Sequence, residues 1–337
     1  MKILILLMGA FVLLSSCSTP ESSSAAQALG GSSQALLYLN CRAVSQEEVE
    51  FEFSQPVTIK HLSFEPELKI ASVENGSTVK VILDDIPEAG KMIVTDIIAE
   101  DEKRNTINVI VSFRSRNDRM PSLEINEICT EYANAAKGKK SEFVELKMKS
   151  DGSLGAMRLV INGNSNAAKE TVYEFSPVNV KKDDYVMIYL RTFDEANKDE
   201  YTDNLLESGG ETSSSAARDF YVQGTEKILH KTSFIYVLDQ DDNVIDAVII
   251  CEKPENWWTK DYFAKAAEFL FNKDSWKSKD GDICRPSDAF ISSGTTNTRT
   301  ICRDESAQNT NSVQDWYITA TSSATPGEKN NTKRYSN

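Results

Sequence analysis

The stretch "LEINEICTEYANAAKGKKSEFVEL" (Leu123–Leu146) decides whether the chain is read as catalytic or as β-structure. It holds two short apolar runs that carry glutamates: Glu127 in the first, and Glu142 with Glu145 in the second. In the second run and just beyond it, apolar side chains fall on alternate positions: Val144, Leu146 and Met148. A period of two is typical of a strand with one face toward a core. We therefore predict two strands whose acids have a structural role.

Upstream of this stretch, β-rich runs with alternating apolar and polar residues recur at the spacing of short strands. They read "ALLYLNCRAV", "VEFEFSQPV", "STVKVILDDI", "KMIVTDIIAE" and "TINVIVSFRS", with turn formers such as "ENGS" and "EKRN" between them. This pattern predicts an antiparallel β-sandwich over residues 35–119. The segments "EFSQPV" and "DEKRN" are similar to those of bacterial immunoglobulin-like domains.

Downstream, "SRNDRMP" (Ser115–Pro121) is a polar joint at which we place a domain boundary. The segments that follow, in chain order, are "LEINE", "EFVEL", "VYEFSPVNVKKDDYVMIYL", "FIYVLDQDDNVIDAVII" and the closing "WYITATSSATPGEKN". Together they resemble a lamin tail domain, which implies an immunoglobulin-like β-sandwich over residues 122–331. The expected fold is all-β, with two tandem immunoglobulin-like β-sandwiches.

A helical insertion at about residues 255–280 interrupts the second sandwich pattern. Within Thr259–Asn272 one face is apolar at helical spacing, and Thr259 is a suitable N-cap. The apolar positions are Phe263, Ala266, Ala267 and Leu270. Aromatic residues crowd here, and we take four as a candidate binding surface: Trp257, Trp258, Tyr262 and Trp276. The alternative is that these rings only pack the helix onto the sandwich.

The N-terminus has the charged start and short apolar run of a secretory signal, "MKILILLMGAFVLL". The following "LSSC" resembles the bacterial lipobox, which implies cleavage after residue 16 and acyl chains on Cys17. Residues 17–34 are poor in large apolar side chains and are expected to be a flexible tether. In that family Ser18, rather than Asp, after the cysteine favours the outer membrane. The membrane, reached through the N-terminal lipid, is thus an expected partner.

Cysteine count and charge restrict the remaining chemistry. Five cysteines besides Cys17 leave an odd number, and Cys284 with Cys302 is the most plausible local disulfide. The net charge of −14 argues against a nucleic-acid partner. Asp239 and Asp241 in "DQDDNVID" begin like an EF-hand loop, but the glycine and distal glutamate of that loop are missing. They remain a weak metal candidate.

No motif predicts catalysis or a cofactor, because the chain lacks a G-x-S-x-G elbow and a phosphate-binding G-x-x-x-x-G-K-[ST] loop. We expect a non-enzymatic, lipid-anchored envelope protein that presents β-sandwiches for binding or adhesion to a protein or glycan. Two alternatives stay open. One is an envelope hydrolase that uses the acids around Glu127 and Glu145. The other is a purely structural spacer, which requires the Trp257–Trp276 region to be fully buried.

Overall fold

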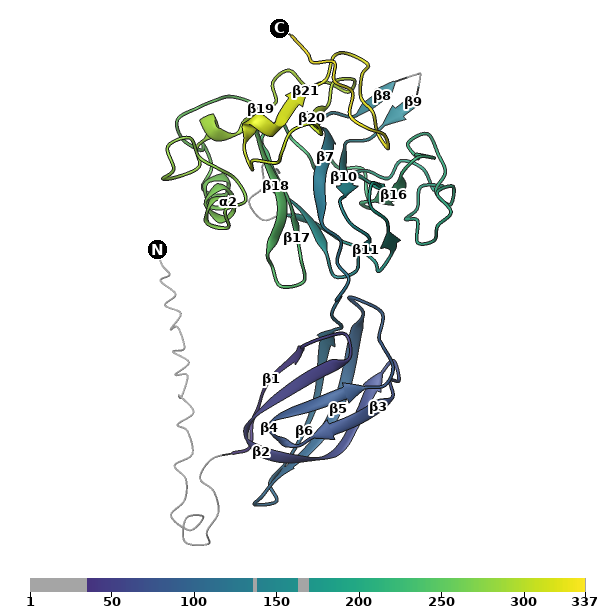
Figure 1. Ribbon diagram of the computed structural model, residues 1–337, viewed down its shortest axis with the longest axis vertical. Helices are drawn as coiled ribbons and strands as arrows, with labels where there is room; N and C mark the ends of the chain where they lie inside the picture. The colour runs from purple at the N-terminus through teal and green to yellow at the C-terminus, as the bar shows by residue number, and fades with distance from the viewer. Residues whose placement is uncertain (1–34, 136–137, 163–169, 337) are drawn as a thin grey trace, which may run out of the picture.

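The computed structural model describes residues 35–135, 138–162 and 170–336, and confirms the predicted all-β sandwich class (Figure 1). The predicted signal peptide, the tether and Cys17 lie outside the described residues. Two groups of sheets share no strand. We call β1–β6 the first unit and β7–β21, with the helix α2, the second unit.

The first unit is one antiparallel sheet of six strands with the order β3-β4-β2-β5-β6, in which β1 also pairs with β2. Its strands are β1 (Tyr38–Ala43), β2 (Glu48–Glu65), β3 (Ile70–Glu74), β4 (Gly76–Leu83), β5 (Met92–Asp101) and β6 (Thr106–Arg114).

Strand β2 lets this single sheet enclose a core. Its first half pairs with β1 and β4 and its second half with β5, and Val57 is paired on both sides. The fully buried members of the core come from strands of both halves: Phe51, Val79, Val81, Ile93, Ile97 and Ala99. In β4, β5 and β6, more buried positions alternate with more exposed ones, as the sequence predicts.

The second unit contains two large sheets. The six-stranded sheet has the order β16-β15-β10-β7-β20-β21. Its strands are β7 (Leu123–Cys129), β10 (Phe143–Met148), β15 (Tyr185–Tyr189), β16 (Arg218–Tyr221), β20 (Ile301–Arg303) and β21 (Trp316–Ile318). The five-stranded sheet has the order β13-β12-β17-β18-β19. Its strands are β12 (Arg158–Asn162), β13 (Thr171–Glu174), β17 (Ser233–Leu238), β18 (Val244–Cys251) and β19 (Phe290–Ile291).

Smaller elements complete the second unit. Two-stranded sheets pair β8 (Ala133–Ala135) with β9 (Gly138–Lys140), and β11 (Gly152–Ser153) with β14 (Asn179–Val180). Short 3-10 turns span Pro286–Asp288 and Val313–Asp315. The pairs β15–β16 and β18–β19 are parallel, so this unit is mixed rather than purely antiparallel.

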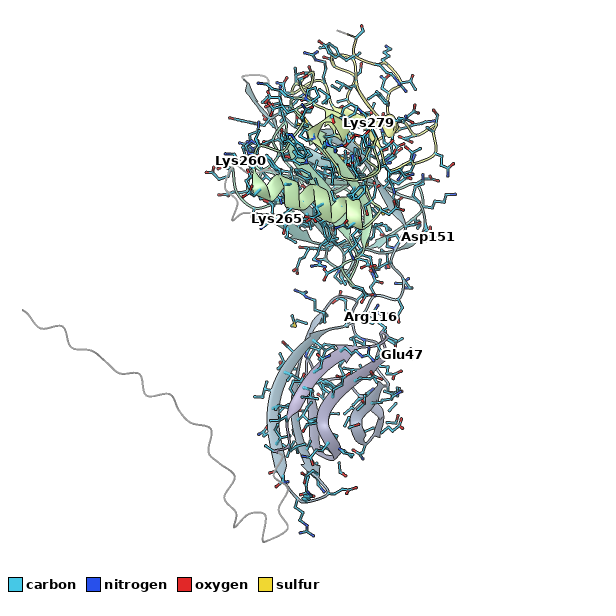
Figure 2. All side chains as sticks on the ribbon, turned by 90° about the vertical axis from the view of Figure 1, so that its left-hand side faces the viewer. Glu47, Arg116, Asp151, Lys260, Lys265 and Lys279 are labelled. Atoms are coloured by element: carbon cyan, nitrogen blue, oxygen red, sulfur yellow. The ribbon has the colours of Figure 1, made fainter. Side chains whose placement is uncertain are left out.

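The main core lies between the two large sheets and includes Ile125, Leu146 and Ile188 from one and Ile235 and Val248 from the other. Helix α2 (Asp261–Asn272) packs against the five-stranded sheet, with Phe263 against Phe234 and Phe269 against Tyr236. Figure 2 shows α2 across this side of the unit, with Lys260 and Lys265 directed outward.

The predicted apolar face of α2 is confirmed, because Phe263, Ala266, Ala267 and Leu270 are its buried residues. The predicted N-cap is wrong. The cap position is Lys260, which makes no side-chain capping bond, and the helix starts one residue later. Aromatic packing therefore holds the start of this helix without a capping hydroxyl.

The joint between the units has buried residues, Ser115, Asn117 and Pro121, and is hydrogen-bonded to the second unit. Asn117 donates its side-chain amide to the carbonyl oxygens of Ser153 and Gly155, at 2.6 and 2.7 Å. Its backbone N–H donates to Gln240 Oε1 at 2.8 Å. The backbones also approach closely, since a Cβ on Gly90 would lie 2.6 Å from the nitrogen of Ala156. These contacts give the polar joint the character of a fixed interface.

Candidate functional site

Glu127 and Glu145 form a buried carboxylate pair on the outer face of the six-stranded sheet. They are cross-strand partners of β7 and β10, and both are fully buried. A register shift between these strands occurs beside Asn126, where two residues of β7 oppose one of β10. Without this bulge, strict alternation would aim Glu127 into the core with Leu123 and Ile125. The bulge is what brings the two acids onto one face.

The pair binds the closing segment, which we define as residues 322–330. Glu127 accepts the backbone N–H of Thr325 at 3.1 Å and the hydroxyl of Thr300. Glu145 accepts the backbone N–H of Gly327 at 2.5 Å and the side-chain amide of Asn126 at 2.7 Å. The carboxylates thus satisfy backbone donors of a loop that lies over the sheet.

Gly327 is required where the closing segment turns. Its φ is +81°, and a Cβ there would lie 2.9 Å from Ser214 Oγ. A side chain at this position would be strained and would push the segment away from Glu145. This contact gives the "TPG" part of the closing motif a physical reason.

Burial raises the pKa of Glu127, and the hydrogen bonds from Thr300 and Thr325 partly oppose this. The pKa of Glu145 is raised well above its usual value by burial first and by the neighbouring charge of Glu127 second. A raised carboxyl pKa suits a general acid. Here, however, both side chains are fully buried beneath the closing segment, and their oxygens already accept its N–H groups. The arrangement gives a substrate no access to either group.

Glu142, the third acid of the opening stretch, is also buried. Arg191 donates to it through Nε and Nη2 at 2.6 and 2.7 Å, and neither side chain is more than 6% exposed. The guanidinium also lies 3.9 Å from the ring centroid of Tyr132. A paired and stacked charge of this kind fixes the end of β10.

Of the four aromatic residues predicted as a binding surface, three pack against the protein and one is exposed to solvent. Trp276 is buried and donates its Nε1–H to the carbonyl of Asp288 at 2.9 Å. Trp258 donates to the carbonyl of Cys284 at 2.9 Å and packs on Phe234. Tyr262 is half-buried against Phe263. These three rings pack the helical segment onto the sheet.

Trp257 is different, because 67% of it is exposed. It borders a cavity of about 220 Å³ that Thr232, Glu252, Glu255 and Trp258 also line. The guanidinium of Arg285 lies 5.7 Å from its ring centroid. An open indole beside carboxylates and a hydroxyl is suited to binding a polar ligand that has one apolar face.

The structure does not form the predicted disulfide, and both cysteines are free and buried. Cys302 belongs to β20, where it is paired in register with Glu127 of β7. Cys284 lies in the loop before the 3-10 turn, where its carbonyl accepts the Trp258 N–H. Because each cysteine is packed into a different part of the unit, closeness in sequence does not make them a pair.

The weak metal candidates serve other roles. Asp239 closes the β17–β18 turn by accepting the N–H groups of Asp241 and Asn243, at 2.8 and 2.9 Å. Asp241 accepts both Nη groups of Arg116, at 2.8 and 2.6 Å. Across residues 35–135, 138–162 and 170–336, no group of three or more His, Cys, Asp or Glu side chains is placed to hold a metal ion.

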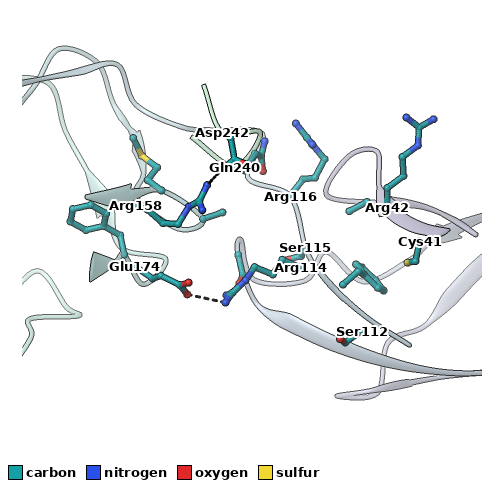
Figure 3. Close-up of a pocket in the computed structure, with 16 residues that line it drawn as sticks. Cys41, Arg42, Ser112, Arg114, Ser115, Arg116, Arg158, Glu174, Gln240 and Asp242 are labelled. Atoms are coloured by element: carbon teal, nitrogen blue, oxygen red, sulfur yellow. Dashed lines mark hydrogen bonds and ion pairs between the residues drawn. The ribbon is translucent and has the colours of Figure 1, made fainter. Parts of the chain in front are cut away.

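A cavity of about 390 Å³ lies between the two units, and it was not predicted from the sequence (Figure 3). Four arginines line it: Arg42, Arg114 and Arg116 from the first unit and the joint, and Arg158 from β12. The "FRSR" run at the end of β6 is the sequence signal for two of them. The others come from distant strands that only the fold brings together.

Comparison with known proteins gives one family match. Residues 121–318, more than half of the chain, match the family model TP_1001_2nd, whose description reads "protein second domain". No curated protein matches the chain. None of the helices in the described part of the chain has the length and hydropathy needed to cross a membrane.

Two solved structures are distantly similar. A DUF4876 family protein from Bacteroides thetaiotaomicron is 14% identical, with 77% of this chain and 90% of that chain covered and a TM-score of 0.32. The N-terminal part of the bacterial S-layer protein SbsC is 17% identical, with 48% and 46% covered and a TM-score of 0.25. Both scores are too low to establish a shared fold.

Proposed function

We propose that this chain, which belongs to the TP_1001_2nd second-domain family, is a lipid-anchored envelope protein that binds a ligand without catalysing a reaction. The observation that carries the proposal is that the carboxylates are buried whereas one indole ring is exposed. The carboxylates suited to acid–base work are buried under the closing segment, whereas Trp257 is open beside a cavity.

The anchor rests on the sequence. The charged and apolar leader is followed by "LSSC", so Cys17 is the proposed site of acylation, and residues 17–34 are the proposed tether. We place the protein at the outer membrane because Ser18, not Asp, follows the cysteine. The lipid would attach a folded body that displays the Trp257 surface.

The two-domain organisation and the lamin-tail-like character of residues 122–331 belong to the same proposal. Two features support the second point: the glutamates of the "LEINE" and "EFVEL" strands, and the "TPG" closing motif that they bind. A tandem of an immunoglobulin-like and a lamin-tail-like domain provides a rigid body for display rather than a catalytic cleft.

Trp257 favours a glycan over a protein as the ligand. Its cavity is small, at about 220 Å³, and combines an indole face with carboxylates and the hydroxyls of Thr232 and Thr259. A sugar ring presents an apolar face for stacking and hydroxyl groups for hydrogen bonds. The spacer alternative requires a fully buried Trp257–Trp276 region, and the exposure of Trp257 contradicts that requirement.

Anchoring is tested by comparing intact mass and detergent partitioning of the wild type and Cys17→Ala, expressed in a bacterium that processes lipoproteins. We expect the wild type to lose residues 1–16, gain the mass of acyl chains and enter the detergent phase. The Cys17→Ala variant should do neither. A wild-type protein without lipid would contradict the anchor.

Binding is tested by co-sedimentation with insoluble envelope polysaccharide. Trp257→Ala should lower the apparent affinity by about tenfold or more, as expected for an aromatic anchor. Tyr201→Ala is the matched control, because Tyr201 is 56% exposed and lies outside the Trp257 cavity. Equal binding by the wild type and both variants, or no binding by any of them, would contradict the proposed surface.

A further inference from the structure

We propose that a cavity on the outer face of the six-stranded sheet binds a neutral sugar residue. This site shares no residue with the Trp257 surface, and the inference does not rest on the proposed function. It rests on a row of buried side chains, on the two segments that cover this row, and on the hydrogen-bonding groups that line the space between them.

The floor of the cavity comes from a row of side chains that crosses four strands. Cys129 of β7 is paired in register with Phe143 of β10, Phe143 with Tyr189 of β15, and Tyr189 with Tyr221 of β16. All four are buried and belong to a hydrophobic cluster that is separate from the main core. Cys129, Phe143 and Tyr189 line a cavity of about 380 Å³, which falls within the usual size of small-molecule sites.

Two segments cover this row without filling the space above it. The closing segment contributes Ala324 and Pro326 to the cavity wall, and residues 211–214 contribute another part of the wall. The buried acids hold both segments, because the Ser214 N–H donates to Asp219 at 2.6 Å as the closing segment donates to its own carboxylates. Protein interiors contain few spaces larger than a water molecule, so a space of this size between two fixed covers has room for a ligand.

The Tyr189 hydroxyl is a polar group without a partner in the described part of the chain. Tyr189 is only 6% exposed, and its ring stacks on that of Tyr221 with centroids 5.0 Å apart. The Tyr221 hydroxyl accepts a hydrogen bond from Ser208 at 3.0 Å, whereas within the described residues the Tyr189 hydroxyl makes none. Buried hydroxyls are normally hydrogen-bonded, so Tyr189 indicates a partner in the cavity that it lines.

The charges of the lining favour a neutral ligand. Only two charged side chains line the cavity, Lys140 and Glu211, and both are exposed and opposite in sign. A charged ligand would lose its hydration there without a net compensating charge.

The other polar groups favour a ligand with several hydroxyl donors. Ser141 donates to the Glu142 carbonyl at 2.9 Å, and Ser213 donates to the Gly210 carbonyl at 3.1 Å. A hydroxyl has a single hydrogen, so both serines offer only lone pairs to a ligand. Asn297 also lines the cavity and adds a carboxamide, which both donates and accepts.

Apolar surface completes the lining, from Phe143, Ala324 and Pro326. The ligand must therefore be neutral, carry hydroxyl groups and present an apolar C–H face. A sugar ring combines these three properties.

The test is saturation-transfer NMR on the full chain in a detergent without a sugar headgroup. The chain carries Trp257→Ala, so that binding does not come from the Trp257 surface. The probes are glucose and N-acetylglucosamine, which are neutral, and glucosamine and glucuronate, which are charged. We expect saturable binding of at least one neutral sugar and weaker binding of both charged ones. Absence of saturable binding by both neutral sugars would mean that the cavity holds water only and would overturn the proposal, as would equal binding of all four probes.

A single hydroxyl locates the binding. Tyr189→Phe removes a hydroxyl that no described residue uses, so the melting temperature should stay unchanged while the Kd of the neutral sugar rises by about fivefold, as expected for one lost hydrogen bond. Tyr335→Phe is the matched control, because Tyr335 lines a different cavity and its substitution should leave the Kd unchanged. Unaltered binding in Tyr189→Phe, or equal weakening in both variants, would contradict the site.

Filling the cavity is the complementary test. Ala324→Phe should raise the Kd by about tenfold or more, because the added ring occupies the space of the ligand, whereas Ala324→Ser should bind like the parent chain. Unchanged exchange of the Gly327 amide would show that the closing segment stays in place in Ala324→Phe. If this variant displaces the segment, Tyr189→Phe decides alone. Full binding in Ala324→Phe with the segment in place would overturn the proposal.

Discussion

The two units contain similar strands in which glutamates alternate with apolar residues, but they bury these glutamates to different extents. In the first unit, Glu48, Glu50 and Glu52 alternate with apolar residues. Glu48 and Glu52 remain partly accessible, and the buried Glu50 pairs with the exposed Arg42. In the second unit, Glu127 and Glu145 lie in similar runs but are fully buried. The difference comes from later parts of the chain, because the closing segment covers the outer face of the six-stranded sheet. Alternation thus identifies a strand but not whether its second face meets water.

The charge pairs show the same contrast. Arg191 and Glu142 in the second unit are almost wholly removed from water, whereas the Lys60–Glu100 pair of the first unit has side chains that are 48% and 28% exposed. A buried pair is costly to break, because the remaining partner keeps its charge without compensation.

Arg191→Met should have the largest effect on stability. It leaves Glu142 buried without its guanidinium and is expected to lower the free energy of unfolding by about 3–5 kcal/mol. Lys60→Met breaks an exposed pair and should cost about 0–1 kcal/mol. Urea unfolding of both variants measures the difference, and equal effects would contradict the assignment of Arg191–Glu142 as the buried pair.

Glu145→Ala should come next. It removes the acceptor of the Gly327 N–H and of the Asn126 side chain, and each buried donor left without a partner costs about 1–3 kcal/mol. Glu52→Ala, at an outward position of β2, should change stability by less than about 0.5 kcal/mol. If the two variants lost the same stability in urea, the outer face of the second sheet would not be covered as described.

Gly90→Ala tests the contact between the units. The φ of Gly90 is +76°, and the added Cβ would meet the Ala156 backbone, so we expect a loss of about 2–3 kcal/mol. Gly281 has a similar positive φ, +74°, but a Cβ added there would meet no atom within 4 Å. Gly281→Ala should therefore lower the free energy of unfolding by only about 1 kcal/mol. Thermal unfolding that ranks the two variants equally would exclude a close backbone contact at the joint.

We also expect a pH dependence of opposite sign in the two units. Burial raises the pKa of Asp219 from 3.8 to about 8. The folded second unit therefore keeps a proton that the unfolded chain releases. Its contribution to stability is complete below about pH 4 and is lost as the pH rises toward 8, by about 1 kcal/mol per pH unit. Asp219→Asn should flatten this decline in urea unfolding.

In the first unit, the hydrogen bond from the Asn105 side chain leads the lowering of the pKa of Asp101. Its contribution to stability is present above its unfolded pKa and is lost as the pH falls through the lower folded value. Acid should thus weaken the first unit while favouring the second. Hydrogen exchange of each unit between pH 4 and pH 8 separates the two trends, and parallel trends would contradict them.

Alternating strands such as β4 and β5 and the apolar face of α2 were predictable because each depends on local periodicity, whereas β3, β16 and β20 were not predicted. The prediction that Glu127 and Glu145 are strand residues agrees with the structure, and their shared face does not follow from alternation. The two glutamates share a face only because of the bulge at Asn126, and no residue in "LEINEI" predicts that bulge. The sequence therefore indicated the strands but not the buried pair.

The remaining features depend on residues that are distant in the chain. Cys284 and Cys302 are close in sequence but packed apart. Arg42 and Arg158 are distant in sequence but line one cavity. The exposure of Trp257 beside a half-buried Trp258 is likewise decided by the helix and loop that pack around them. Such placements follow from the assembled fold rather than from any local pattern.

The central claim is that the buried carboxylate pair holds the closing segment and serves no substrate. Amide hydrogen exchange at Thr325 and Gly327, in the wild type and in Glu145→Gln, tests this most directly. We predict strong protection of both amides in the wild type and much faster exchange at Gly327 in the variant. Exchange of both wild-type amides at the rate of an unstructured chain would contradict the claim, since the acids would then be open to solvent and to a substrate.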